Sequence, residues 1–222
     1  MGRPSSSSRW TVTSASEPGG DLGARSAEPS WVAALEAEAP DVVGCWRVTD
    51  YSRAGVGRLR RELGRRVFTA DAPRIMAQQE AVARALAAAL AELPDELLRA
   101  PGGEEDWNVA QTFAHATAAR RFLASWAALD AGGEPVEDRH PPVATPSVAG
   151  PPQASREDLL LYLDKSTRAQ RQAADRIEGH ELQPCFLEHP LIGRLRCGDW
   201  LLFVGVHDLM HLEQLHRLAG QG

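Results

Sequence analysis

The chain has 222 residues, of which 43% are apolar, and a formal net charge of −6 at pH 7. This size and apolar content suffice for a hydrophobic core, and we expect one domain with an appendage. The negative charge argues against nucleic acid or a membrane surface as the main partner, because both are polyanionic. We therefore expect a small-molecule substrate as the partner, and a homodimer is compatible with the sequence.

Cysteine usage and the absence of targeting segments indicate a reducing compartment. No apolar run approaches the roughly 18 residues that span a bilayer, and the N-terminus lacks the basic and apolar regions of a signal peptide. The three cysteines, Cys45, Cys185 and Cys197, lack C-x-x-C spacing, which argues against a disulfide framework or a cysteine zinc knuckle. We expect a cytoplasmic protein with idle, buried thiols.

The first 70 residues differ in composition from the rest of the chain. Residues 1–30 are rich in Ser, Gly and Pro, and we expect a disordered arm. Residues 31–70 form an N-terminal extension for which the pattern predicts no definite structure. The extension contains a dense run of arginines, namely Arg53, Arg58, Arg60, Arg61, Arg65 and Arg66. Because Glu62 interrupts this run and no aromatic residues are interleaved, it favours a solvated or ion-paired helix face over a nucleic-acid site.

From residue 71 the apolar residues recur at helical spacing, so the sequence predicts an all-α fold, a four-helix bundle, over residues 71–220. The first helix begins after a capping Asp71 and has Pro73 in its first turn, where a missing N–H does no harm. Pro94 ends this helix, because proline cannot continue the hydrogen-bond pattern.

The second helix begins near Trp107 and fades near residue 131. Asn108 and Gln111 have the spacing of a capping box at its start. The following connection extends to residue 154 and is long for a compact helical bundle. More than 20 residues easily cover the ~30 Å length of a bundle, so the second and third helices can run parallel.

The third helix opens at Ser155 and ends at Gly179, and the fourth runs from near Asp199 to Gly220. Between them, residues 185–200 are too apolar for a surface linker, and we expect them to fold over the mouth of the bundle. No strand-rich region is expected after residue 71.

The fourth helix carries a buried stripe that includes two histidines. The stripe consists of Trp200, Phe203, Val204, His207, Met210, His211, Gln214, Leu215 and Leu218. Residues four apart on a helix lie roughly 5–6 Å apart at Cβ, so His207 and His211 can hold one cation at metal–nitrogen distances near ~2.1 Å. His115 lies in the apolar middle of the second helix and supplies a third ligand.

The predicted metal ligands are therefore His115, His207 and His211. Neutral nitrogen ligands suit a divalent transition metal, Zn²⁺ first and Ni²⁺, Co²⁺ or Fe²⁺ as alternatives, rather than Mg²⁺ or Ca²⁺, which prefer oxygen. Three protein ligands also leave a coordination position for water or substrate, as a catalytic site requires. The sequence assigns no catalytic side chain of the protein itself.

The H-D-x-x-H string at 207–211 differs from the zinc protease motif H-E-x-x-H in having Asp208 for glutamate. Only 11 residues follow His211, which leaves little room for a downstream ligand, and aspartate is shorter than the glutamate that would reach a bound water. The sequence therefore disfavours a protease.

The remaining histidines are weaker candidates for chemistry. His140 and His180 lie in loops and His216 lies off the ligand stripe, so we expect these three to be solvated. His189 precedes a proline in the apolar segment between the last two helices. We expect it at the rim of a pocket.

Three ordered segments of the chain carry a resemblance to a known family. They are 106–115 (DWNVAQTFAH), 189–193 (HPLIG) with 198–200 (GDW), and 207–214 (HDLMHLEQ). Together they resemble the DinB-like superfamily of metal-binding four-helix proteins, which includes mycothiol- and bacillithiol-dependent S-transferases and maleylpyruvate isomerase. The resemblance covers roughly residues 71–220. It implies an up-down-down-up bundle with metal ligands at His115, His207 and His211.

The resemblance and the open triad lead to one leading hypothesis and two alternatives. The first is a metal-dependent S-transferase that uses a low-molecular-weight thiol of the mycothiol type as cosubstrate and acts on small electrophiles. The second is a metal-dependent isomerase or hydrolase of a small carbonyl compound, with Glu213 and Gln214 as the nearby polar residues. The third is a non-catalytic metal-binding or interaction bundle. The family does not decide among them.

Overall fold

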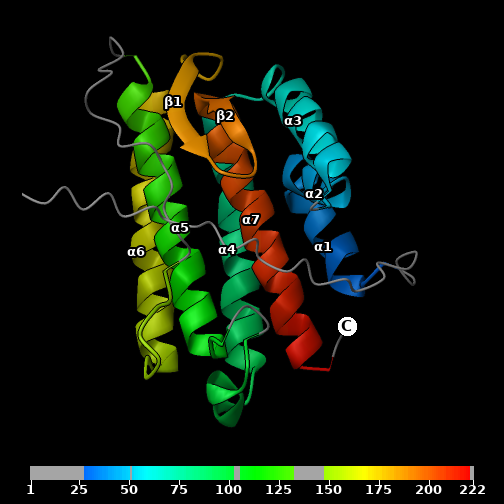
Figure 1. The fold of residues 1–222 in the computed structure, drawn as a ribbon, viewed down its shortest axis with the longest axis vertical. Helices are drawn as coiled ribbons and strands as arrows, with labels where there is room; N and C mark the ends of the chain where they lie inside the picture. Colours follow the sequence, from blue (N-terminus) through cyan, green and yellow to red (C-terminus); the bar gives the residue numbers. More distant parts are fainter. Residues whose placement is uncertain (1–27, 51, 103–105, 133–147, 221–222) are drawn as a thin grey trace, which may run out of the picture.

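The structure is a computed structural model that describes residues 28–50, 52–102, 106–132 and 148–220 (Figure 1). The described elements are α1 (Ser30–Glu38), α2 (Pro40–Arg47), α3 (Arg53–Val67), α4 (Ala72–Glu92), a 3-10 helix η1 (Asp95–Arg99), α5 (Val109–Asp130), α6 (Arg156–Ile177), β1 (Pro184–His189), β2 (Gly193–Arg196) and α7 (Cys197–Leu218). The fold is all-α apart from one small hairpin, which confirms the predicted class. No helix within the described ranges has the length and apolar character needed to cross a membrane.

The starts of three bundle helices lie where the sequence predicts them. The Asp71 side chain accepts a hydrogen bond from the backbone N–H three residues later and caps α4. Asn108 and Gln111 form a reciprocal capping box at α5, and Ser155 and Asp158 form another at α6. Each cap satisfies backbone N–H groups that have no partner inside the helix, so these starts are fixed by local sequence.

Helices α4, α5, α6 and α7 form the bundle, and α5 and α6 run parallel in it (Figure 1). At one end, the Arg156 guanidinium at the start of α6 donates to the Leu93 carbonyl at the end of α4, at 2.5 Å. At the other end, Gln183, just after α6, donates to the Asp130 carbonyl at the end of α5, at 2.6 Å. The order is therefore up-down-down-up, as predicted. Residues 133–147 of the long connection lie outside the described residues.

A β-hairpin between α6 and α7 is the main departure from the predicted elements. Strands β1 and β2 pair antiparallel, with Glu188 opposite Arg194, and Gly193 takes a positive φ of 74° where the second strand begins. Cys185 and Leu187 are buried on one face of β1. The sequence predicts no strand-rich region after residue 71 but does not indicate this short hairpin, because an alternation only a few residues long is hard to separate from an apolar run. The hairpin lies at the end of the bundle where α7 begins (Figure 1).

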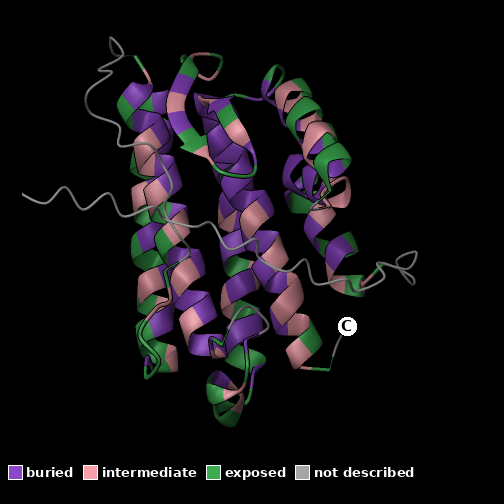
Figure 2. Cartoon of the chain, viewed as in Figure 1, coloured by how far each residue is buried: buried purple, intermediate pink, exposed green. Residues whose placement is uncertain are grey.

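The N-terminal extension is helical and packs against the bundle. Helices α1, α2 and α3 lie beside α7 and α4, and their inner faces are buried (Figure 2). Val42 and Trp46 of α2 are 0% and 2% exposed. A Cβ at Gly205 of α7 would lie 2.9 Å from the Val42 side chain, so glycine there allows α2 to approach α7 closely. The predicted disordered arm, residues 1–30, lies outside the described residues except for its last three.

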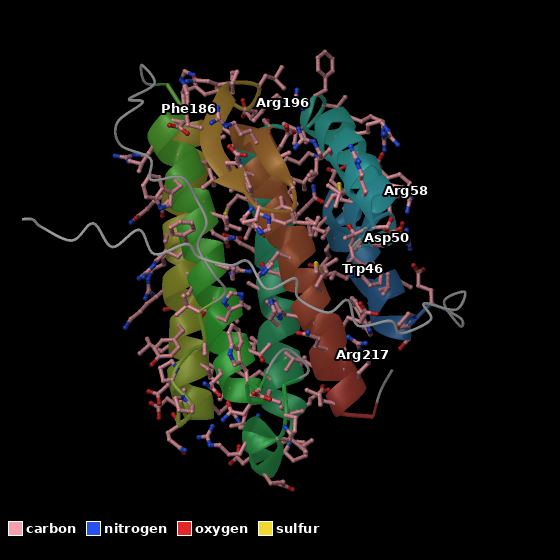
Figure 3. All side chains as sticks on the ribbon, viewed as in Figure 1. Trp46, Asp50, Arg58, Phe186, Arg196 and Arg217 are labelled. Atoms are coloured by element: carbon pink, nitrogen blue, oxygen red, sulfur yellow. The ribbon has the colours of Figure 1, made fainter. Side chains whose placement is uncertain are left out.

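Three of the six arginines in the run of α3, namely Arg58, Arg65 and Arg66, form ion pairs with described residues. Arg58 pairs with Asp50, and both lie on this N-terminal layer (Figure 3). Arg66 bonds Glu62 at 2.7 Å and Asp41 of α2 at 3.0 Å, which ties the two helices together.

Candidate metal centre

The fold brings His115 of α5 together with His207 and His211 of α7. One ring nitrogen of each lies within 4.8 Å of the others. The ring centroids of His207 and His211 are 4.6 Å apart, and each lies 5.9 Å from that of His115. One turn of α7 thus presents two imidazoles, and the neighbouring helix presents the third from a position two turns inside its start.

The spacing of these nitrogens fits a transition-metal ion. The Nε2 atoms of His207 and His211 lie 3.3 Å apart. Two ligands at ~2.1 Å from a tetrahedral centre are separated by about 3.4 Å. Two unprotonated nitrogens at that distance repel each other unless a proton or a cation lies between them. The donor set is neutral nitrogen throughout, which suits Zn²⁺ and its transition-metal neighbours.

Two of the imidazoles are oriented through their second nitrogen. His115 Nδ1 lies 3.1 Å from the Val148 carbonyl oxygen, and His211 Nδ1 lies 2.8 Å from Gln214 Oε1. Because these oxygens only accept, each Nδ1 carries the proton and each Nε2 keeps a free lone pair for a metal. His207 Nδ1 is buried and has no hydrogen-bond partner among the described residues.

Burial favours the neutral form of the His207 imidazole, which is the form that binds a metal ion. The loss of hydration lowers the pKa of His207 well below its ordinary value, and the neighbouring His211 and His115 lower it further. The imidazole is therefore neutral at pH 7. A metal ion therefore meets a neutral ring with one free lone pair, and no imidazolium proton has to be displaced.

A buried ion pair stands directly behind the triad. Arg120 of α5 pairs with Asp208 of α7, and both side chains are 0% exposed. Arg120 Nε also donates to the Ser166 hydroxyl of α6 at 3.2 Å, and its Nη2 donates to Gln170. Three helices are thereby tied together next to His207. The Asp208 carboxylate is held by Arg120, which removes it as a protease-type base.

A cavity of about 580 Å³ lies beside the triad. His115 and His207 line it, together with residues of α6, the hairpin and the segment 148–151. The expected rim residue His189 is in this lining, next to Phe203, with ring centroids 6.2 Å apart. His189 Nδ1 accepts the backbone N–H of Leu191 at 3.2 Å, so in the neutral ring the proton is on Nε2. Burial lowers the pKa of His189 and favours that neutral ring.

The other histidines and the cysteines follow the sequence expectations with one correction. His180 is exposed, as expected, and His140 lies outside the described residues. His216, expected to be solvated, is instead half-buried and stacks on Trp31 of α1, with ring centroids 5.2 Å apart and planes 12° from parallel. That expectation is wrong because α1 covers this side of α7. Cys45, Cys185 and Cys197 are all free and buried.

The polar residues that support the triad carried little signal in the sequence. The Val148 carbonyl is a backbone group, so no residue type marks it. Gln214 is an exception, because it lies on the predicted stripe three residues after His211, a spacing at which side chains of one helix meet, and the sequence makes it a candidate acceptor together with Gln111 or a carbonyl. Arg120 lies on the buried face of α5, four residues after Ala116 and three before Leu123. A charge at such a position requires a buried partner.

A comparison with protein-family models identifies residues 78–215 as a match to the model described as the DinB superfamily. The matched segment runs from α4 to α7 and contains all three histidines of the triad. Comparisons with curated proteins and with solved structures find no match. The family model covers well over half of the chain and coincides with the four bundle helices. The chain therefore belongs to the DinB superfamily.

Proposed function

We propose that the protein is a metal-dependent S-transferase, which joins a low-molecular-weight thiol of the mycothiol type to a small electrophile. The observation that carries the proposal is the open side of the triad, which faces a cavity of about 580 Å³. That volume lies within the range of small-molecule sites. When bound, a divalent ion such as Zn²⁺ supplies Lewis acidity that lowers the pKa of a thiol.

The protein's own side chains have two tasks in this proposal. His115, His207 and His211 would hold a divalent cation through neutral nitrogens, and such a ligand set would leave the full positive charge of the site available to a thiolate. The rings of Phe122 and Phe203 line the cavity and offer apolar surface to an electrophile. The thiol proton leaves to solvent, the sulfur attacks the electrophilic carbon, and the leaving group departs with its bonding electrons.

The lining of the cavity favours thiol transfer over carbonyl isomerisation or hydrolysis. Enzymes that isomerise or hydrolyse carbonyl compounds commonly need a base that takes a proton at the substrate or from a water molecule. No Asp or Glu is among the described residues that line the cavity, and Gln214 is engaged by His211. His189 presents an N–H rather than a lone pair. A thiolate needs no such base once its proton has left to solvent.

The protein's cysteines take no part in the proposed reaction. Burial raises the pKa of Cys45 to about 12. A hydrogen bond with Cys197, together with burial, raises the pKa of Cys185, so both residues remain thiols at neutral pH. Neither residue lines the cavity beside the triad. The reacting sulfur therefore has to come from a cosubstrate.

A conjugation assay tests the proposal. Zinc-loaded protein is mixed with 1-chloro-2,4-dinitrobenzene and a panel of thiols that includes mycothiol, bacillithiol, glutathione and N-acetylcysteine. We expect at least one thiol to react about tenfold or more faster than in buffer. His115→Ala should lose this acceleration, and His180→Ala, at an exposed position far from the triad in sequence, should keep it. No acceleration with any thiol, in protein shown to hold the metal, would contradict the proposal.

A further inference from the structure

The single lysine of the chain lies at the cavity beside the triad. The sequence has 24 basic residues, and Lys165 is the only one that is not arginine. Lys165 lies on α6 and lines the cavity together with Arg121 of α5. The parallel packing of α5 and α6 thus places two cationic side chains on one wall.

Neither cation is paired with a described residue of the protein. Lys165 and Arg121 have no hydrogen bond or ion pair with any described residue. By contrast, Arg168, one turn after Lys165 on α6, pairs with Asp164, and Arg120, next to Arg121, pairs with Asp208. Within the part of the chain that the structure describes, the neighbouring cations thus have acidic partners, whereas Arg121 and Lys165 have none.

The charged side chains that line the cavity are positive, whereas the chain as a whole has a net negative charge. The chain has more acidic than basic residues, 30 against 24, yet no described Asp or Glu lines the cavity. Its charged lining residues are Arg121 and Lys165, and a divalent ion at the triad would add further positive charge. A cleft lined by one sign of charge concentrates ligands of the other sign.

The helix geometry sets the size of a ligand that reaches both ends of the cavity. His115 and Arg121 are six residues apart on α5, which is roughly 9 Å along the helix axis. Tyr162, Phe122 and Phe203 line the same cavity. A ligand with a reacting group at the triad and an anionic group at the cationic wall therefore has an apolar body a few bonds long.

We propose that Lys165 and Arg121 form an anion subsite for the carboxylate of a small organic acid. The assignment of the ligand as a reactant rests on the proposed transferase function, and it narrows the substrate class to anionic compounds. Binding of the carboxylate itself depends on the two side chains and not on the metal. The carboxylate belongs either to the thiol or to the electrophile, and the test separates these sources.

The lone lysine provides a specific probe of the subsite. Reductive methylation with ¹³C-formaldehyde labels Lys165 and the N-terminal amine and preserves their positive charge. Two matched pairs are titrated: N-acetylcysteine with its amide, and 4-phenylbutyrate with 4-phenylbutyramide. We expect each carboxylate that binds to shift the Lys165 resonance saturably and its amide to leave the resonance in place. A response to the first pair assigns the carboxylate to the thiol, and a response to the second assigns it to the electrophile.

Variants show whether the two cations act together. Arg121→Gln should weaken carboxylate binding about threefold to tenfold, as expected for loss of one partly exposed charge contact. Arg168→Gln is the matched control on α6 and should leave the affinity unchanged. The titrations are run with zinc-loaded and with chelator-treated protein. Binding to the treated protein is expected even if the conjugation assay fails, which keeps the two proposals distinguishable.

Three results would overturn the subsite. The first is equal affinity for a carboxylate and its amide. The second is an equal loss of affinity in Arg121→Gln and Arg168→Gln. The third is no saturable shift of the Lys165 resonance with any carboxylate up to about 10 mM, which corresponds to negligible binding.

Discussion

The orientation of His211 depends on a single side chain on its own helix. Gln214 accepts the Nδ1 proton of His211 at 2.8 Å, which fixes the tautomer and turns Nε2 toward its partners in the triad. A ligand held in its productive tautomer binds a metal without first reorienting. Residues of this kind affect metal affinity although they do not touch the ion.

Gln214→Ala should therefore weaken zinc affinity by about 10- to 100-fold, as is typical when such a partner of a histidine ligand is lost. The measurement is competition against a chelating dye of known affinity. Glu213→Ala is the control, because Glu213 is the adjacent residue and has no hydrogen bond or ion pair with the described residues. Equal affinity of the Gln214 variant and the parent would show that the contact does not orient the ligand.

Single residues of the site differ in how far the sequence reveals them. His207 and His211 stand out because they fall on one buried stripe, and His115 stands out as a polar residue within an apolar helix face. The Val148 carbonyl could not be predicted, because it belongs to the connection whose path depends on the tertiary fold. The stacking of His216 on Trp31 could not be predicted for the same reason, because Trp31 lies on α1, far from His216 in the sequence.

Helices α5, α6 and α7 are held in register by the buried contacts of Arg120. Its ion pair with Asp208 has no exposed surface, and Ser166 and Gln170 accept its remaining N–H groups. Asp208 is adjacent to His207 in α7. A shift of α7 along α5 that broke the ion pair would therefore also move His207 relative to His115. The pair thus links the packing of the helices to the geometry of the site.

Arg120→Met should lower the free energy of unfolding by about 3–5 kcal/mol, because it leaves the Asp208 carboxylate buried without a partner. Urea denaturation measures the loss. Arg168→Met breaks an exposed pair with Asp164 and should cost under about 1 kcal/mol. The double variant Arg120→Met/Asp208→Leu should recover much of the stability. A loss no larger in Arg120→Met than in Arg168→Met would refute the role of this pair.

At the level of helices and strands, the predictions that the structure confirms rest on signals from residues close together in the sequence. Caps at Asp71, Asn108 and Ser155 mark helix starts because the hydrogen bonds are made within four residues. The parallel course of α5 and α6 follows from the length of the connection. The hairpin at β1 and β2 was missed because its strands are short and one of them contains a register irregularity, which disturbs strict alternation.

The molecule as a whole is larger than the segment that matches its family. The match begins at residue 78, whereas α1, α2 and α3 precede it and pack against α7 and α4. Helices α1 and α2 have only nine and eight residues, too few to show a helical repeat. In α3, however, Val56, Leu59, Leu63 and Val67 recur at helical spacing and could have identified that helix. Gly198 and Gly205 are two positions of α7 where the extension packs closely, since a Cβ at Gly198 would lie 2.7 Å from Val67 of α3 and one at Gly205 would lie 2.9 Å from Val42 of α2.

Gly205→Ala tests the packing of the extension. Alanine favours a helix by about 1 kcal/mol over glycine, but its Cβ would lie 2.9 Å from Val42, and overpacking costs about 1–3 kcal/mol. We expect a net destabilisation of about 1 kcal/mol in urea. Gly57→Ala in α3 is the matched control, because its Cβ would meet only Arg61 Nη1 at 3.6 Å, and it should stabilise the protein. Stabilisation by both variants would contradict close contact between α2 and α7.

The most direct test of the account is the metal content of the purified protein. Elemental analysis of chains prepared without chelators should find about one equivalent of a transition metal, as three histidine ligands predict. His115→Ala should lose the metal while it remains folded by circular dichroism, and His180→Ala should retain it. Absence of a transition metal from the parent protein, also after incubation with Zn²⁺, or the same content in His115→Ala, would contradict a metal centre at His115, His207 and His211.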